Sequence, residues 1–324
     1  MTSPLRVLLT DRAWPDNLIE RDILAQAGAE VVEPADTSEA ALVAAAADCD
    51  ALGTCWAAVP ATVIDAAPRL RCISRFGIGL DNIDVARATE RGIPVTNVPD
   101  YCVDEVADHT IALLLAITRQ VAWYHHQTKR GLYERQSGRA LRRLSTLTLG
   151  LIGFGRTGQA VYQRARALGF QVQASSRSGD SAGTGCPMVS LDRLLSTSDC
   201  ISLHLPLTEE SRHLLGAEQF ATLKEGAAVI NTARGGLIDH QALYSAIQSH
   251  QVSAAALDVF DPEPPDLSEP LFADERVIAT PHAAFLSQES LLDLRTRASV
   301  HLLQALQGHR PDQVVNPSIY GPSA

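Results

Sequence analysis

The sequence predicts an α/β protein of two domains, each built around a doubly wound parallel sheet. Three observations lead to this fold class. The chain has 324 residues, enough for two separate cores. Strand-like and helix-like segments alternate along most of its length, as in folds with parallel sheets. A glycine-rich turn also joins a strand to a helix near the middle of the chain.

Composition and charge argue against several classes of protein function. With 46% hydrophobic and 20% charged residues, the chain is typical of a globular protein rather than a disordered one. The net charge is −10 and no basic stripe is present, which argues against nucleic-acid and membrane partners. Six scattered cysteines lack metal or redox spacing, so we expect reduced thiols and no metal site. No apolar run is long enough for a signal peptide or membrane span, which predicts a cytoplasmic protein.

In the first third of the chain, short runs of apolar residues are separated by helical patterns. Gly28 and Pro68 end two of the helices. The expected strands are residues 6–10, 30–33, 51–54 and 70–75, and the expected helices are residues 18–27, 39–47 and 61–67. Because helices separate consecutive strands, the strands should pair in parallel.

A long helical pattern at residues 103–121 begins the second domain, after the boundary signals Pro94 and Pro99. An arginine-bearing connector, residues 130–143, follows it. The alternation then resumes, with strands at 147–152, 170–174, 200–203, 227–231, 254–258 and 277–279, a helix at 159–168, and a last helix at 288–306. This second series again predicts a parallel sheet.

The glycine-rich turn lies directly between a strand and a helix, and consists of Gly153, Phe154, Gly155, Arg156, Thr157 and Gly158. The first glycine permits the tight turn, the second lets a pyrophosphate approach the backbone, and the third lets helix and strand pack closely. The helix N-terminus would face the phosphates. In this context the GxGxxG pattern predicts a Rossmann-type dinucleotide-binding domain.

The residues after the next strand bear on the choice of cofactor. An NAD enzyme normally places an acid there to bind the ribose 2′-hydroxyl, but this chain has Ser176 and Arg177, with no acid before Asp180. A guanidinium and small hydroxyls suit a 2′-phosphate. The sequence therefore favours NADP(H); the alternative is a solvated Arg177 in an enzyme that also uses NAD(H).

Three polar residues follow later strands of the second series. Arg234, Glu263 and His282 come at or just after strands that should end at one sheet edge. An arginine can clamp a carboxylate and polarise a carbonyl, a histidine can exchange the hydroxyl proton, and a glutamate can orient the imidazole. Each alone also has a structural explanation, such as turn capping or a solvated loop position. Together, after a dinucleotide motif, they indicate carbonyl reduction.

With these motifs, the sequence resembles the D-isomer-specific 2-hydroxyacid dehydrogenases over nearly the whole chain. The resemblance rests on the glycine turn and on residues 75–84, 97–107, 198–208, 231–236, 257–264 and 280–282. It implies an NAD(P)-dependent oxidoreductase that interconverts small-molecule 2-oxo acids and D-2-hydroxy acids, acting mainly as a 2-oxo acid reductase.

The resemblance also implies roles for particular residues. Arg234 would bind the substrate carboxylate and carbonyl, His282 would be the general acid/base, and Glu263 its partner. The backbone amides of Ile78 and Gly79 would hold the other side of the carboxylate. Besides the glycine turn, the cofactor-binding residues would be Ser176, Arg177, His204, Pro206, Thr232, Ala233 and Asp258.

At the level of domains, the resemblance implies a discontinuous plan. Residues 1–98 and 286–324 would form the substrate-binding domain and residues 99–285 the NAD(P)-binding Rossmann domain, with the active-site cleft between them. A homodimer is expected, with the apolar face of helix 103–121 serving either as its contact or as an internal core face. Trp56, Tyr101 and Phe285 either border the substrate pocket or belong to the core.

Within the family, the chain is most similar to the C-terminal binding protein branch, through residues 106–110 and 280–285. That group carries an acid where this chain has Ser176 and a tryptophan where it has Phe285. The alternative function is therefore a dinucleotide-sensing corepressor or scaffold that controls a protein partner.

Overall fold

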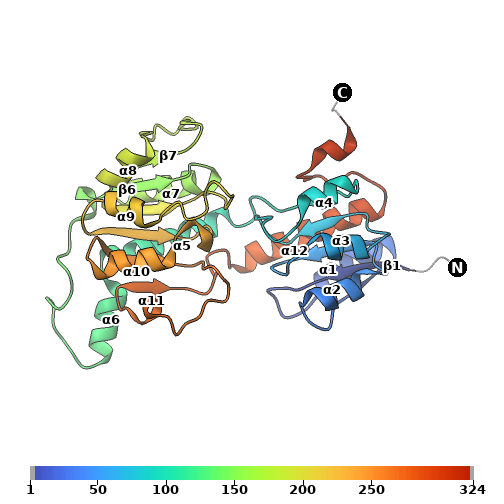
Figure 1. Cartoon of the computed structure of the whole chain (residues 1–324), viewed down its shortest axis with the longest axis horizontal. Helices are drawn as coiled ribbons and strands as arrows, with labels where there is room; N and C mark the ends of the chain where they lie inside the picture. The colour runs from blue at the N-terminus through green and yellow to red at the C-terminus, as the bar shows by residue number, and fades with distance from the viewer. Residues whose placement is uncertain (1–3, 322–324) are drawn as a thin grey trace. The chain divides into compact units, whose positions relative to one another are not determined.

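In this computed structural model residues 4–321 are described, and the chain divides into two compact units (Figure 1). The first unit comprises residues up to Tyr101 together with those from Ser287 onward, and the second comprises Cys102–Leu286. Each unit holds one sheet whose strands all pair in parallel, which confirms the predicted fold class.

The first unit contains a five-stranded sheet in the order β2-β1-β3-β4-β5. Its strands are β1 (Leu5–Leu9), β2 (Ala29–Val32), β3 (Ala51–Thr54), β4 (Ile73–Arg75) and β5 (Val95–Thr96). Its helices are α1 (Leu18–Leu24), α2 (Glu39–Ala46), α3 (Ala61–Ala66), α4 (Val85–Glu90) and α12 (Gln288–Leu306). Successive side chains of β1 face opposite sides, so Leu8 packs in one core cluster while Val7 and Leu9 pack in the other.

The last helix, α12, belongs to the first unit although it follows the second unit in the chain. The Ser74 hydroxyl of β4 donates to the Ala298 carbonyl oxygen at 3.0 Å. Arg295 donates to both carboxylate oxygens of Glu20 on α1, at 2.8 and 2.9 Å, and both side chains are buried. Arg297 pairs with Asp100 at 2.7 Å, so the segment just before residue 102 is also held by α12.

The second unit contains a six-stranded sheet in the order β11-β10-β9-β8-β6-β7. Its strands are β6 (Thr148–Ile152), β7 (Gln171–Ser175), β8 (Cys200–Leu203), β9 (Ala227–Asn231), β10 (Val252–Leu257) and β11 (Val277–Ala279). Its helices are α5 (Val103–Thr118), α6 (Val121–Lys129), α7 (Arg156–Ala167), α8 (Leu191–Thr197), α9 (Ala217–Thr222), α10 (His240–Gln248) and α11 (Pro270–Ala273).

Both faces of the second sheet are covered by helices. Leu113 of α5 and Val161 of α7 pack against one face, and Leu194, Phe220 and Leu243 of α8, α9 and α10 pack against the other. Buried strands of this kind are apolar on both sides, which explains the apolar runs that identified them in the sequence. The apolar side of α5 is therefore an internal core face.

The structure differs from the sequence prediction at several helices. The helix expected at 103–121 ends at Thr118, and α6 begins at Val121 after Gln120, whose φ of 53° breaks the helix. The Gln120 side chain exchanges two hydrogen bonds with the backbone of Arg139, at 2.7 and 2.8 Å, which fixes this break. Helices α8 and α10 were not predicted, although Ser190 and Asp239 cap their N-termini. None of the helices within residues 4–321 is long and apolar enough to cross a membrane.

Candidate active site

The predicted site residues of the second unit follow the carboxyl ends of its strands. Because all six strands are parallel, these ends lie at one sheet edge, where open α/β sheets bind ligands. Strand β6 lies between β7 and β8, so the connection from β6 to β7 runs toward one edge of the sheet. The connection from β7 to β8 then runs back in the opposite direction, past β6. The residues that follow the six strands are Gly153, Ser176, His204, Thr232, Asp258 and Thr280.

The glycine turn has the geometry that a pyrophosphate needs. Gly153 has a φ of 94°, and a Cβ there would collide with the His204 carbonyl oxygen. A Cβ on Gly158 would lie 2.5 Å from the Gly153 carbonyl oxygen, so this glycine lets α7 pack on the turn. In contrast, a Cβ on Gly155 would meet nothing within 4 Å. The backbone is thus open at the one glycine where a phosphate would approach, and the turn fits a dinucleotide.

The other predicted cofactor-binding residues in and near the turn differ in their burial. The Phe154 side chain is buried and packs edge-on against Tyr162, with ring centroids 5.8 Å apart, so only its backbone faces the turn. Arg156 is exposed and Thr157 half-buried at the first positions of α7. His204 is half-buried, its Nε2 lies 2.9 Å from Ser202 Oγ, and burial lowers its pKa to about 4. Pro206 is exposed, two residues further on.

The end of β7 presents hydroxyl groups and an arginine. Ser176 Oγ lies 3.3 Å from Ser178 Oγ, and Arg177 between them is exposed. The next acid, Asp180, accepts a hydrogen bond from the Ala182 amide at 2.8 Å and so closes a turn of its own loop. No carboxylate therefore follows β7 directly.

Glu263 and His282 form a hydrogen-bonded pair. His282 Nδ1 lies 2.7 Å from Glu263 Oε2, and Glu263 Oε1 accepts from the Phe260 amide at 2.8 Å. A carboxylate only accepts hydrogen bonds, so Nδ1 carries a proton and Nε2 is the atom that can exchange one. Both side chains are about 30% exposed, at 29% for His282 and 31% for Glu263, so the pair is reachable from solvent.

The loop of Arg234 packs directly on the loop of Glu263. A Cβ on Gly235 would overlap the backbone of Phe260, so glycine allows this close approach. Asn231 holds the loop on its other side, because its Oδ1 accepts from the Ala233 amide at 3.0 Å and its Nδ2 donates to the Arg234 carbonyl oxygen at 2.8 Å. Arg234 Nη1 donates to the Ala233 carbonyl oxygen at 2.7 Å. The guanidinium-bearing loop and the histidine–glutamate pair are thus neighbours.

In the first unit, the predicted carboxylate-binding amides lie in the loop after β4. The Gly77 carbonyl oxygen accepts from the Val98 amide at 3.0 Å, and the Ile78 carbonyl oxygen accepts from Asn97 Nδ2 at 2.7 Å. Within residues 4–321, the amides of Ile78 and Gly79 have no hydrogen-bond partner. Two neighbouring backbone N–H groups without partners are suited to an anion.

Arg75, a residue without a predicted role, lies beneath this loop. Arg75 is 8% exposed, and its Nε has no hydrogen-bond partner among the described residues. A Cβ on Gly77 would lie 2.8 Å from the guanidinium carbon of Arg75, so the charge sits against the loop. A buried arginine of this kind is a candidate for anion binding. Its place at the end of a buried strand was the signal available in the sequence.

Comparison with known proteins agrees with this geometry. Residues 111–284 match the family model described as D-isomer specific 2-hydroxyacid dehydrogenase, NAD binding domain. The match covers more than half of the chain. This chain belongs to the D-isomer specific 2-hydroxyacid dehydrogenase family.

Several members of this family are similar over most of their length. A glyoxylate reductase of Korarchaeum cryptofilum is 35% identical over 89% of both chains. A hydroxypyruvate reductase of Thermotoga maritima is 40% identical over 76% of this chain and 80% of its own. The crystal structure of an NADPH-dependent glyoxylate/hydroxypyruvate reductase of Sinorhizobium meliloti, in complex with NADP and malonate, is 28% identical with a TM-score of 0.87, covering 99% of this chain and 100% of its own. These comparisons support the family and do not single out the C-terminal binding protein branch.

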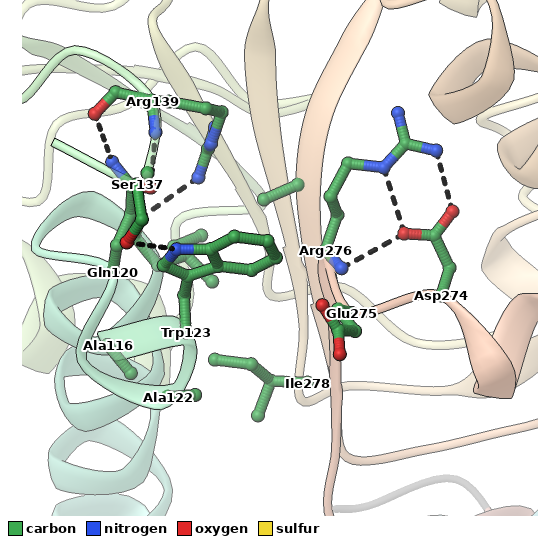
Figure 2. A pocket seen from close by; sticks show the side chains of 13 residues that line it. Ala116, Gln120, Ala122, Trp123, Ser137, Arg139, Asp274, Glu275, Arg276 and Ile278 are labelled. Atoms are coloured by element: carbon green, nitrogen blue, oxygen red, sulfur yellow. Dashed lines mark hydrogen bonds and ion pairs between the residues drawn. The ribbon is translucent and has the colours of Figure 1, made fainter. Parts of the chain in front are cut away.

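One cavity of this D-2-hydroxyacid dehydrogenase lies away from the candidate site. It measures about 610 Å³ and is lined by residues of α5, α6 and the connector together with residues at the amino ends of β10 and β11 (Figure 2). Figure 2 shows Trp123 and Arg139 on one side and Arg276, paired with Asp274, on the other. Because the strands are parallel, their amino ends lie opposite the edge that carries the glycine turn and His282, so we assign no catalytic role to this cavity.

Proposed function

We propose that this protein reduces small 2-oxo acids to D-2-hydroxy acids with a nicotinamide cofactor, NADP(H) in preference to NAD(H). The observation that carries the proposal is the pairing of His282 with Glu263 at 2.7 Å, beside the Arg234 loop and at the sheet edge of the glycine turn. The relatives named above carry the names of 2-oxo acid reductases. The alternative of a scaffold that senses dinucleotides gains no support from them.

The glycine turn, Ser176 and Arg177 would hold the cofactor, with His204, Pro206, Thr232, Ala233 and Asp258 around it. When bound, the nicotinamide supplies the hydride that reduces the substrate carbon. The protein's own residues position the substrate and move the proton. Arg234 would bind the substrate carboxylate and polarise the neighbouring carbonyl.

His282 would complete the reaction. In the reducing direction it gives the Nε2 proton to the substrate carbonyl oxygen, and in the oxidising direction it takes the hydroxyl proton back. Glu263 accepts the hydrogen bond from Nδ1 and so fixes the direction of the imidazole. Its own orientation is fixed by the Phe260 amide, 2.8 Å away.

For the two units we propose a division of labour. The second unit would bind the cofactor, and the first unit would contribute the amides of Ile78 and Gly79, with the buried charge of Arg75, to the substrate carboxylate. Among the described residues those amides have no hydrogen-bond partner, which supports this part of the proposal.

The preference for NADP(H) rests on the residues after β7. A 2′-phosphate would be repelled by an acid at that position, and here Ser176, Arg177 and Ser178 occupy it. The exposed guanidinium of Arg177 can make charge-assisted hydrogen bonds to a phosphate.

We also propose that the protein is a homodimer, with a contact different from the helix face considered above. That face of α5 is buried in the second unit. Exposed apolar side chains are instead carried by α6 and the connector, namely Val121, Leu132, Tyr133 and Leu141, which are 57%, 54%, 82% and 40% exposed. Such side chains are typical of a surface covered by a partner.

Replacing His282 with Asn tests the catalytic assignment. We expect kcat for reduction of glyoxylate or hydroxypyruvate to fall by about 100- to 10,000-fold, because the proton donor is lost. Steady-state kinetics with NADPH measures this change. Equilibrium binding of NADPH should stay within a few-fold of wild type, since the glycine turn is untouched. Near-normal turnover of a folded His282→Asn protein would refute the assignment.

A further inference from the structure

Asp258 is hydrogen-bonded to three consecutive backbone amides around His282. Its carbonyl oxygen accepts from the His282 amide at 2.8 Å. Its carboxylate accepts from the Ala283 amide and the Ala284 amide, each at 2.9 Å. Asp258 is fully buried, so these bonds are shielded from water.

These hydrogen bonds stabilise an unfavourable backbone conformation at His282. His282 has a φ of 50°, in the left-handed region that is unfavourable for a residue with a side chain. Such a conformation persists when the surroundings hold it. Asp258 stabilises this conformation through the hydrogen bonds to its carbonyl oxygen and to its carboxylate. The direction of the imidazole therefore depends on Asp258 as well as on Glu263.

The carboxylate of Asp258 is itself held by two side chains. Thr280 Oγ1 donates to Asp258 Oδ1 at 2.5 Å. His109 of α5 lies beside this hydroxyl, with its Nε2 at 3.0 Å from Thr280 Oγ1 and 3.5 Å from Asp258 Oδ1. All of these residues belong to the second unit.

The direction of the hydrogen bonds can be derived. A hydroxyl donates one hydrogen bond, and Thr280 gives its proton to the carboxylate. Thr280 Oγ1 therefore accepts from His109, so His109 Nε2 carries a proton. The chain of donors runs from His109 through Thr280 to Asp258, and each bond places positive charge density toward the buried carboxylate.

We infer that His109 and Thr280 are positioning residues that act through Asp258 to fix the backbone of His282 for proton transfer. The inference rests on the proposed function, because it concerns the residues that hold His282, the proposed general acid, in position. It gives Asp258 a role besides any contact with the cofactor. It also links helix α5 to the catalytic loop, a link that the sequence pattern did not indicate.

Two matched pairs of variants test the inference. Thr280→Val keeps the shape of the side chain and removes the hydroxyl, whereas Thr280→Ser keeps the hydroxyl. His109→Leu removes the donor, whereas His109→Gln keeps an N–H at a similar distance. The measurements are kcat and KM for glyoxylate or hydroxypyruvate with NADPH, equilibrium binding of NADPH, and thermal unfolding.

We expect Thr280→Val and His109→Leu each to lower kcat by about tenfold or more, the effect of losing a hydrogen bond to a charged group. The KM for the 2-oxo acid and the Kd for NADPH should change less than about threefold, because Arg234 and the glycine turn are untouched. Thr280→Ser and His109→Gln should recover most of the lost kcat. A general packing defect would not show this rescue.

Two results would overturn the inference. One is a folded Thr280→Val or His109→Leu protein whose kcat stays within twofold of wild type. The other is an equal loss in both members of a pair, which would make the shape of the side chain the cause. Failure of the proposed function is distinguishable, since the wild-type protein would then show no turnover of either 2-oxo acid, or His282→Asn would keep the wild-type turnover, whatever the Thr280 and His109 variants do.

Discussion

At the scale of single residues, the candidate site depends on side chains whose partners fix their direction or charge. Glu263 sets the protonated nitrogen of His282, and Asn231 braces the loop of Arg234. Arg75 is held at 8% exposure beneath the loop of Ile78. The charge of Arg75 is screened by little water, which strengthens its interaction with an anion.

We expect a change at Ser176 to reverse the proposed preference for NADP(H). In the Ser176→Asp variant a carboxylate would bind the ribose 2′-hydroxyl of NADH and repel the 2′-phosphate of NADPH. We expect the ratio of kcat/KM for NADPH over NADH to fall by about 100-fold, because each tenfold change corresponds to about 1.4 kcal/mol. Steady-state kinetics with both cofactors measures the ratio. The Ser181→Asp variant, at a half-buried position further along the same loop, serves as the control. A wild-type enzyme that prefers NADH would contradict the proposal.

His204 makes stability depend on pH. Its pKa is lowered to about 4 by burial, below the usual value of 6.5, so the unfolded chain binds a proton more readily than the folded one. The folded state therefore loses stability as the pH falls from 6.5 toward 4, by at most about 3 kcal/mol. Urea unfolding at several pH values should show this slope, and His204→Gln should flatten it. An unchanged slope in the variant would assign the pH dependence to other groups.

At the scale of elements, glycines decide how closely the segments approach. The turn between β6 and α7 uses one glycine for its φ, one for open space and one for packing. Gly235 similarly lets the loop after β9 lie on the backbone of Phe260. The helix expected at 103–121 is broken because Gln120 bonds to the distant backbone of Arg139, a tertiary contact that outweighs local helix propensity.

Substitutions at two glycines of the turn should affect protein stability and cofactor binding separately. Gly155 has an ordinary φ of −74° and open space where a Cβ would be, so Gly155→Ala should keep the thermal midpoint within a few degrees. The added methyl would occupy the path of the pyrophosphate, and we expect the Kd for NADPH to rise at least tenfold. Gly158→Ala is the matched contrast, since its Cβ would press on Gly153 and destabilise the protein by about 1–3 kcal/mol. Unchanged NADPH binding by Gly155→Ala would contradict this assignment.

At the scale of the whole molecule, the chain builds its first unit from both of its ends. Arg295 and Glu20 form a buried ion pair between α12 and α1, and breaking one partner of such a pair leaves an uncompensated charge. The second unit is inserted between these segments, as residues 102–286. The exposed apolar side chains of α6 and the connector lie in this inserted unit.

The proposed dimer can be tested at that surface. Tyr133 is 82% exposed, and Tyr133→Asp would place a charge in the contact between two copies. We expect sedimentation velocity to show a shift from the mass of two chains to that of one at micromolar concentration. Leu18→Asp, at a side chain of the first unit that is 59% exposed, is the control and should remain dimeric. A wild-type protein that sediments as a single chain would refute the proposal.

The sequence by itself determined the parallel α/β fold and the dinucleotide turn, and it predicted Arg234, Glu263 and His282 as the centre of the candidate site. These properties are local, because apolar runs, glycine spacing and strand ends can be read along the chain. Tertiary structure decided the rest. The break at Gln120, the buried charge of Arg75 and the support of His282 by Asp258, Thr280 and His109 each join residues far apart in sequence. Their effect comes from distance and burial, which depend on how the elements pack and which no local pattern encodes.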